Sequence, residues 1–383
     1  MATTEIAWTQ SVWNPVRGCL RVSPGCGGGT PGEAKGGCYA ETMAARIVRM
    51  GGYEWIDGAW RDDSNKKANP AARRSADRYK PLVRINKAGK ARWTGVFAFD
   101  EEKLAEPLRR RTPTMCFVNS MSDLFGDGVS DEQIAAVFGV MAACPQHTFQ
   151  ILTKRAARMV EWFKWIAGEQ AGALGRLFDR VGGLWTHTID GCAARAIEAA
   201  NTAGLKIPTP GRPLRWPLPN VWLGVSCEDQ PRADERIPLL LKCPAAVRWV
   251  SAEPLLGPVD LSNYLDCGYE SGGPQGWIDL PSVDWVVGGG ESGHDARPCA
   301  LEWLVGLARQ CKAAATSYFN KQLGAHVVSE ERVIDGQWAW RAGLKDRKGA
   351  DPAEWPEDLR VREWPRGFMP PKSKKSLPVV GGA

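Results

Sequence analysis

The stretches NVWLGVSCEDQ (220–230) and VRWVSAEPLLGPVDL (247–261) each run from near-continuous apolar residues into a short polar segment. Four further stretches follow the same pattern, at 115–125, 147–155, 283–293 and 315–324. Most of the six are followed by a helix-like segment, such as ALEWLVGLARQCKAA (300–314). Buried strands that alternate with helices are typical of a parallel sheet covered by helices. The sequence therefore predicts an α/β fold.

The polar segments at the ends of these strands read NSMSD, TKR, SCED, SAEP, GGES and NKQ. The carboxyl ends of parallel strands meet at one edge of a sheet, where functional residues gather in such folds. We therefore expect the six segments to form the rim of an active site.

Three stretches interrupt the alternation of strands and helices. Residues 50–95 are basic and rich in turns, residues 165–218 include a Pro-rich run, and residues 262–280 are rich in Gly. We expect all three to be insertions in a single domain that spans residues 1–327. Residues 328–383 are then a C-terminal extension, whose end we expect to be disordered.

The composition is that of an ordinary globular protein. Of 383 residues, 44% are hydrophobic and 24% charged, which excludes a coiled coil or a wholly disordered chain. No apolar run approaches the ~20 residues of a membrane span. The first residues, MATTEIAWTQSVWNP, lack the basic region and apolar core of a signal peptide. We expect a cytoplasmic protein with no membrane partner.

Positive charge is concentrated in one segment. The formal net charge is +6, but Arg61–Arg92 alone contains eleven Lys or Arg and three Asp. A local excess of this size indicates a polyanionic partner, and we expect nucleic acid, most simply DNA, to bind segment 61–92. A solvated charged face is the alternative.

Three of the eleven Cys lie close together, in WNPVRGCLRVSPGCGGGTPGEAKGGCYAE (13–41). Six residues separate Cys19 from Cys26, and eleven separate Cys26 from Cys38. In a reducing compartment such Cys favour metal binding or catalysis over disulfides. A structural zinc ion would need a fourth ligand, and no His lies nearby in the sequence. Three thiolates suit an iron–sulfur cluster that keeps one iron open to another ligand.

Ten sequence blocks carry a family resemblance. In order they read WTQSVWNPVRGC, SPGC, CYAE, FVNSMSDLFGDGV, ILTKR, VWLGVSCED, SAEPLLGPVDL, VVGGGESG, FNKQLG and DLRVREWP. With these blocks the chain resembles the phage Gp37/Gp68-like three-Cys-motif family, which is itself similar to radical S-adenosylmethionine enzymes. The resemblance implies a partial parallel (β/α)6 barrel with insertions, and a cluster loop (13–41) at its mouth.

The resemblance also implies the cofactors. Cys19, Cys26 and Cys38 would bind a [4Fe-4S] cluster, whose open iron would bind S-adenosyl-L-methionine. An external electron donor such as flavodoxin would reduce the cluster, and cleavage of the sulfonium would give a 5′-deoxyadenosyl radical. The family usually has two residues between the second and third Cys, so here the loop must bulge outward for Cys38 to reach the cluster.

The resemblance assigns roles to further residues. We expect Lys154, Glu253 and Cys227 to be catalytic, although Cys227 also fits a buried thiol that points away from the site. We expect cofactor binding from Tyr39, Asn119, Ser120, Ser122, Asp123, Ser226, Glu228, Ser251, Gly289, Gly290 and Glu291. Alternatives are a helix N-cap for residues 119–123, surface ion pairs for Lys154 and Arg155, and a local turn for Ser226 and Glu228. Lys321 and Gln322 are possible substrate contacts.

Two functions remain open. The leading interpretation is a radical S-adenosylmethionine enzyme that modifies or rearranges a substituent of a nucleic-acid base, as in the thymidine hypermodification of phage DNA. The alternative is a non-enzymatic protein that binds nucleic acid or a partner and carries a structural three-Cys metal site.

Overall fold

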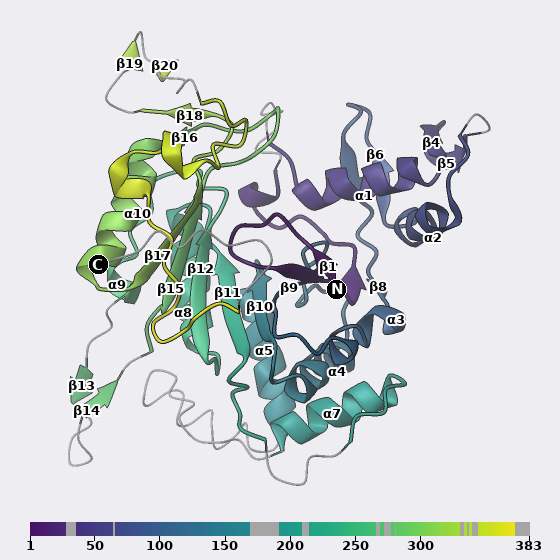
Figure 1. The fold of residues 1–383 in the computed structure, drawn as a ribbon, viewed down its shortest axis with the longest axis horizontal. Coiled ribbons are helices and arrows are strands. Elements are labelled where there is room, and N and C mark those ends of the chain that lie inside the picture. Colours follow the sequence, from purple (N-terminus) through teal and green to yellow (C-terminus); the bar gives the residue numbers. More distant parts are fainter. Residues whose placement is uncertain are drawn as a thin grey trace.

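The computed structural model describes residues 1–27, 36–63, 66–168, 191–208, 214–265, 269–271, 277–279, 281–329, 333–334, 337–338 and 344–371. An eight-stranded sheet forms its centre (Figure 1). The strands in spatial order are β1 (Ala2–Thr3), β2 (Ser11–Trp13), β9 (Met115–Val118), β10 (Thr148–Thr153), β11 (Val221–Ser226), β12 (Val247–Ala252), β15 (Trp285–Gly289) and β17 (Ser317–Gln322).

All neighbouring strands from β2 to β17 are parallel, and only β1 pairs antiparallel. The predicted α/β class with a mainly parallel sheet is therefore confirmed. The six expected strands are all present, and the sequence analysis missed β2, whose three residues are too short to show a pattern.

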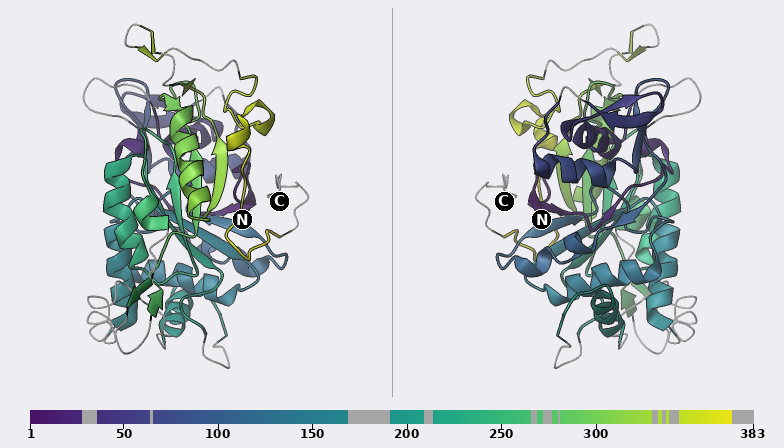
Figure 2. Two further views of the ribbon diagram at one scale, coloured as in Figure 1. Left: turned by 90° about the vertical axis from the view of Figure 1, so that its left-hand side faces the viewer. Right: turned by 90° about the vertical axis from the view of Figure 1, so that its right-hand side faces the viewer.

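Helices cover one face of this sheet (Figure 2). They are α4 (Asp131–Ala143), α5 (Ala156–Ala167), α7 (Cys192–Thr202), α8 (Gln230–Leu241) and α10 (Leu301–Ala313). α4 starts at a capping box, in which Ser130 and Gln133 satisfy each other's backbone N–H groups. Side chains such as Ile151, Val225 and Val250 belong to the core under these helices.

The opposite face of the sheet has a core of its own, built mainly from Trp. Trp222, Trp249, Trp285 and Phe319 pack there with residues from both ends of the chain. Gly224 pairs with Trp249 on the neighbouring strand, and a Cβ at Gly224 would lie 2.4 Å from the Trp249 ring. Because side chains alternate between the faces, Ser226 and Ser251 share this face with Trp222 and Trp249.

A smaller lobe follows the cluster loop (Figure 1). It contains α1 (Tyr39–Met50), β4 (Tyr53–Ile56), β5 (Ala59–Asp62), α2 (Pro70–Tyr79), β6 (Val83–Ile85) and β7 (Ala91–Trp93). Its own apolar cluster includes Val48, Trp60 and Leu82.

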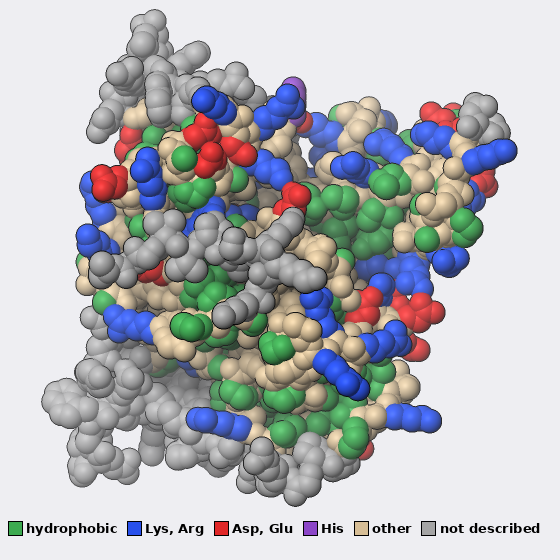
Figure 3. Space-filling view, viewed as in Figure 1, with side chains coloured by type: hydrophobic (Ala, Val, Ile, Leu, Met, Phe, Trp, Pro, Cys, Tyr) green, Lys and Arg blue, Asp and Glu red, His purple; other side chains and the backbone are tan. Residues whose placement is uncertain are grey.

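The basic segment 61–92 lies in this lobe, where Lys and Arg side chains are visible in Figure 3. Five of its cations are held in ion pairs: Lys66, Arg73, Arg78, Lys90 and Arg92. The segment therefore presents less net charge to a partner than its sequence suggests.

The C-terminal segment covers the edge of the sheet. Asn320 N–H donates to Val361 O at 2.9 Å, and Glu363 N–H donates to Tyr318 O at 2.9 Å, so this segment shields edge strand β17. Trp364 stacks on Trp285 with ring centroids 5.4 Å apart. Residues 372–383, most of the expected disordered end, lie outside the described residues.

The remaining elements are short. They are β3 (Val16–Arg17), β8 (Ala98–Phe99), α3 (Glu101–Leu104), α9 (Ser262–Leu265), β13 (Tyr269–Ser271), β14 (Trp277–Asp279), β16 (Cys299–Ala300), β18 (Val327–Val328), β19 (Val333–Ile334) and β20 (Gln337–Trp338), with 3-10 turns at Pro24–Cys26 (η1), Pro107–Arg109, Pro352–Glu354 and Glu357–Leu359. Across the described part of the chain, no helix has the length and apolar character needed to cross a bilayer.

A pair of Gly substitutions tests the Trp core. We expect Gly224→Ala to lower the free energy of unfolding by about 1–3 kcal/mol, because its Cβ would overlap Trp249. Gly306→Ala in α10 meets nothing within 4 Å and should be neutral or stabilising by up to about 1 kcal/mol. Urea unfolding followed by Trp fluorescence measures both. Equal stability of the two variants would contradict this packing.

Candidate functional site

The three Cys of the motif gather at the carboxyl ends of the parallel strands. Cys19 follows β3, Cys26 ends η1, and Cys38 immediately precedes α1; all three are partly buried. Burial, together with the charges of Asp123, Cys38 and Cys26, raises the pKa of Cys19 to about 12, although the nearby Arg155 charge opposes the shift. The three thiols therefore lie within electrostatic reach of one another. Among the described residues, no three His, Cys, Asp or Glu side chains form a ready-made metal site.

Two glycines close the long gap between Cys26 and Cys38. Gly27 has a φ of +78°, and a Cβ on it would lie 2.6 Å from the Cα of Gly37. The chain therefore returns to its starting point before Cys38, as the expected outward bulge requires. Residues 28–35 lie outside the described part of the chain.

An ion pair between Asp123 and Arg155 holds the first part of the loop. Arg155 Nη1 lies 3.1 Å from Asp123 Oδ2 and 3.9 Å from Cys19 Sγ, and Nη2 donates to Leu20 O at 2.9 Å. Asp123 also accepts from Thr153 Oγ1 at 2.7 Å and from Lys154 N at 3.0 Å. Asp123, predicted to bind cofactor, is thus fully engaged in positioning Arg155 beside Cys19.

Glu228, just beyond β11, holds the middle of the loop. Its carboxylate is fully buried and lies 3.0 Å from both Lys154 Nζ and Arg236 Nη1, while Ser23 Oγ donates to it at 2.5 Å. Burial by itself would raise the pKa of Glu228, but the Lys154 and Arg236 charges and the Ser23 hydroxyl lower it to about 2. Gly25 packs directly on this carboxylate. Glu228 and Lys154 therefore anchor the loop rather than face open space.

Glu291, beyond β15, holds the last part of the loop. Arg297 donates to its carboxylate through Nε at 2.8 Å and Nη2 at 3.0 Å, and Gly37 N–H donates to it at 3.2 Å. Arg297 Nη1 also reaches Pro24 O at 2.7 Å. Glu291, like Glu228, therefore binds the cluster loop itself. We call the three carboxylates with their cations, Asp123–Arg155, Glu228–Lys154/Arg236 and Glu291–Arg297, the carboxylate clamps.

Residues 119–122 brace the entry to the loop. Ser120 Oγ donates to Asn14 Oδ1 at 3.2 Å, and Ser122 Oγ donates to Val16 O at 2.9 Å, so both predicted cofactor ligands are used within the chain. Asn119 differs, because it is buried with a φ of +61° and its Nδ2 has no partner among the described residues. Its amide nitrogen is therefore available to donate a hydrogen bond to a ligand or a water molecule.

Glu253 and Lys321 form a pair that makes no hydrogen bond or ion pair with the described part of the loop. Lys321 Nζ lies 2.9 Å from Glu253 Oε1, and Ser251 Oγ lies 3.5 Å from Glu253 Oε2. Ser226 pairs with Ser251 on the adjacent strand and faces the same side. Ser226, Ser251, Glu253, Lys321 and Asn119 take no part in the carboxylate clamps. Their polar groups are therefore available to bind a ligand.

Gly289, Gly290 and Cys227 are closely packed against other parts of the chain. A Cβ at Gly289 would lie 2.7 Å from Glu253 Oε1, and one at Gly290 would lie 2.2 Å from Leu323 O. Both glycines therefore serve close packing between strand ends. Cys227 is fully buried in the core under the helices, and this burial raises its pKa strongly, which favours the alternative of a buried thiol that points away from the site. Strand alternation explains this, because Ser226 faces the site and its successor cannot.

Sequence reasoning missed several residues of the clamps. Ser23 carried no local signal because its partner Glu228 lies 205 positions away in the sequence, and nothing in the sequence showed that Arg236 and Arg297 turn back onto Glu228 and Glu291. Tyr39, the first residue of α1, is 64% exposed and contacts none of the clamps.

One family comparison identifies the chain's relatives. Residues 3–349 match DUF5131, described as a protein family of unknown function. The chain belongs to this family. No curated protein matches it, and no solved structure matches it.

The Glu228 clamp predicts a pH-dependent stability difference. The pKa of Glu228 falls from 4.5 to about 2 on folding, so its stabilisation is fully present above pH 4.5 and is lost as pH falls through about 2. We expect Glu228→Gln to lower unfolding free energy by on the order of 3 kcal/mol at pH 7, leaving two buried cations without a counter-charge. The difference from wild type, measured by urea unfolding, should shrink towards pH 2. A difference independent of pH would contradict the clamp.

The contact between Gly27 and Gly37 predicts that the intervening residues can be removed. Excising residues 28–36 leaves Cys26-Gly27-Gly37-Cys38, with two residues between the Cys. We expect this variant to keep the iron content of the full chain after anaerobic reconstitution, whereas Gly27→Val should lose most of it through steric overlap. Iron loss in the excised variant together with full iron in Gly27→Val would exclude this closure.

Proposed function

We propose that the protein is a radical S-adenosylmethionine enzyme that modifies or rearranges a substituent of a nucleic-acid base, with thymidine of phage DNA as the preferred substrate class. One observation carries the proposal: three thiols lie within electrostatic reach of one another beyond the carboxyl ends of a parallel sheet, on a loop that the three clamps hold. The strands follow each other in chain order, which supports a partial (β/α)6 barrel.

The donor set fits a [4Fe-4S] cluster. Cys19, Cys26 and Cys38 would supply three thiolates, and one iron would remain for S-adenosyl-L-methionine. Arg155 lies beside Cys19, and backbone N–H groups of Ala40 and Glu41 face Cys38 and oppose the burial that raises its pKa. These groups would stabilise negative charge on the sulfurs. When bound, the cluster would supply the electron that cleaves S-adenosylmethionine into methionine and a 5′-deoxyadenosyl radical.

The polar groups left available by the clamps would serve the bound molecules. Asn119 Nδ2 and the Ser226 and Ser251 hydroxyls are buried near the carboxyl ends of their strands, where they would bind polar groups of the cofactor. Glu253 and Lys321 would hold or move a proton at the substrate, because their ion pair keeps one charge of each sign 2.9 Å apart. The Trp core beneath them would exclude water from below.

The proposed function requires two partners, an electron donor and a nucleic acid. A cytoplasmic electron donor such as flavodoxin would reduce the protein, and the substrate would be nucleic acid. Exposed Arg61, Lys67, Arg74, Arg84 and Lys87 are cations of segment 61–92 that would reach a phosphate backbone.

The three Cys should act as one unit. We expect Cys38→Ala to abolish both iron loading and 5′-deoxyadenosine formation under anaerobic conditions with S-adenosylmethionine and dithionite, because two thiolates do not hold the cluster. Cys144→Ala, which removes a buried thiol of the helix-side core, is the matched control and should retain both. Full iron content in Cys38→Ala, or zinc in place of iron in the wild type, would reject the enzyme in favour of a structural metal site.

The Glu253–Lys321 pair should affect turnover alone. We expect Glu253→Gln to bind iron like wild type but to lose at least tenfold in modified nucleoside, measured by mass spectrometry of digested DNA, since a positioned acid or base contributes about 10²–10⁴-fold. Glu235→Gln on the exposed face of α8 makes the same substitution away from the site and is the control. Wild-type product from Glu253→Gln would remove this pair from the active site.

A further inference from the structure

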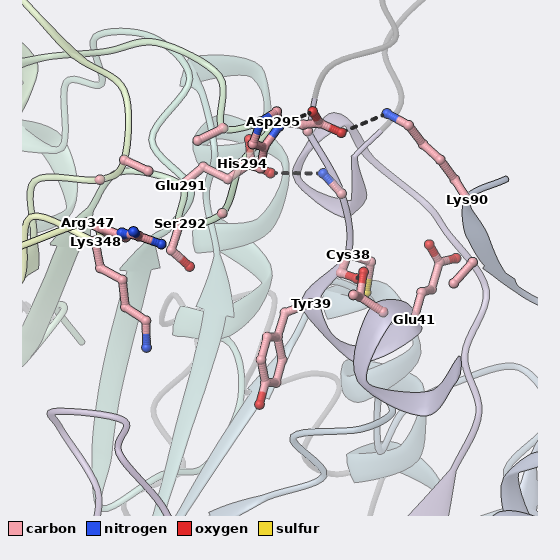
Figure 4. A pocket seen from close by; sticks show the side chains of 18 of the residues that line it. Cys38, Tyr39, Glu41, Lys90, Glu291, Ser292, His294, Asp295, Arg347 and Lys348 are labelled. Carbon is pink, nitrogen blue, oxygen red and sulfur yellow. Dashed lines mark hydrogen bonds and ion pairs between the residues drawn. The ribbon is translucent and has the colours of Figure 1, made fainter. Parts of the chain in front are cut away.

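A large cavity lies beside Cys38 (Figure 4). Its volume is about 1150 Å³. One wall comes from α1 and the β6–β7 hairpin, and the other comes from residues 291–296 after β15 and residues 344–348 of the C-terminal segment. The cavity therefore connects the proposed cluster site with a space between two parts of the molecule, large enough for a nucleotide.

The cavity carries an excess of positive charge. Its acidic groups are already engaged: Glu41 with Arg21, Glu291 with Arg297, and Asp295 with Lys90. Asp346 accepts the backbone N–H groups of Lys348 and Ala350.

The cations Arg347 and Lys348 line the same space and are exposed. No ion pair involves either side chain within the described ranges. A further cation, Arg92, pairs with Glu41, which also pairs with Arg21. Two positive charges therefore meet one carboxylate there. The surplus charge suits an anionic ligand.

An exposed aromatic ring faces this charge. Tyr39 is the first residue of α1, directly after Cys38, so the helix fixes its position. In Figure 4, Tyr39 and Cys38 lie on one side of the cavity, and Arg347, Lys348 and Ser292 lie on the other. A solvent-exposed ring across from unpaired cations is how proteins bind single-stranded nucleic acid, since bases stack on the ring while phosphates meet the cations.

We propose that this cavity binds one nucleotide of a nucleic-acid strand, with the base stacked on Tyr39 and the flanking phosphates held by Arg347 and Lys348. The assignment rests on the proposed function for why a base should lie next to Cys38. The concave shape favours a nucleotide over an acidic electron-donor protein, whose convex surface would leave the cavity unfilled. Arg347 and Lys348 thus have a role distinct from the five cations of segment 61–92 that are held in ion pairs, two of which, Lys90 and Arg92, also line the cavity.

The test is binding of a fluorescein-labelled single-stranded 12-mer containing thymidine, followed by anisotropy with the reconstituted full-length protein. We expect Arg347→Glu/Lys348→Glu to weaken binding at least tenfold and to reduce the slope of log affinity against log salt by roughly 1.4, at ~0.7 per lost phosphate contact. Tyr39→Ala should weaken binding about tenfold, and Tyr39→Phe should restore it because the ring is retained.

The matched control is Lys206→Glu/Lys312→Glu, which makes the same charge change at exposed positions outside the cavity. Iron content and thermal unfolding of each variant check the fold. Equal losses in the control, or wild-type affinity in the cavity variant, would overturn the proposal. Binding of thymidine monophosphate but not of the 12-mer would overturn the proposal that the ligand is a nucleic-acid strand and would indicate a free nucleotide. Loss of flavodoxin affinity alone would assign the cavity to a protein partner.

The two proposals fail separately. If the wild type forms no 5′-deoxyadenosine, the radical function is wrong, whereas the binding data still decide whether the cavity takes a nucleotide.

Discussion

The structure around the Cys motif depends on carboxylates that stand beyond the parallel strands and bind the loop above them. Asp123, Glu228 and Glu291 each pair with an Arg or Lys, and through Leu20, Ser23, Pro24 and Gly37 they hold successive parts of the loop. A Gly-rich segment has high conformational entropy, so the thiols would not stay together without such contacts. Burial strengthens these contacts, because breaking a buried ion pair leaves a charge without its partner.

The sheet can support the clamps because both of its faces are packed. Helices cover one face, while Trp222, Trp249 and Trp285 fill the other below the site. The C-terminal segment adds Trp364 to that core and shields β17. Functional side chains on rigid elements hold their geometry better than those on loops alone, and here a loop is attached to such elements at three points.

The strands and the Cys cluster were predictable because each depends on local pattern. Apolar runs ending in polar residues located the six longer strands, and period-two alternation places Ser226, Glu228 and Ser251 on the site face. The same alternation should have excluded Cys227. The partners could not be predicted, since Glu228 meets Ser23 across 205 positions in the sequence. Residues predicted to bind the cofactor, such as Asp123 and Glu291, contact the chain itself in this structure, because a polar strand end serves loop anchoring as well as ligand binding.

The central claim is that three clamped thiols leave one coordination site open on a metal cluster. Mössbauer spectroscopy of the anaerobically reconstituted full-length protein, before and after addition of S-adenosylmethionine, tests it most directly. The account predicts four irons per chain, with one iron site whose signal shifts when S-adenosylmethionine binds, because that iron has no thiolate from the protein. Irons that all stay unchanged on addition, or a chain that binds zinc and no iron, would contradict it.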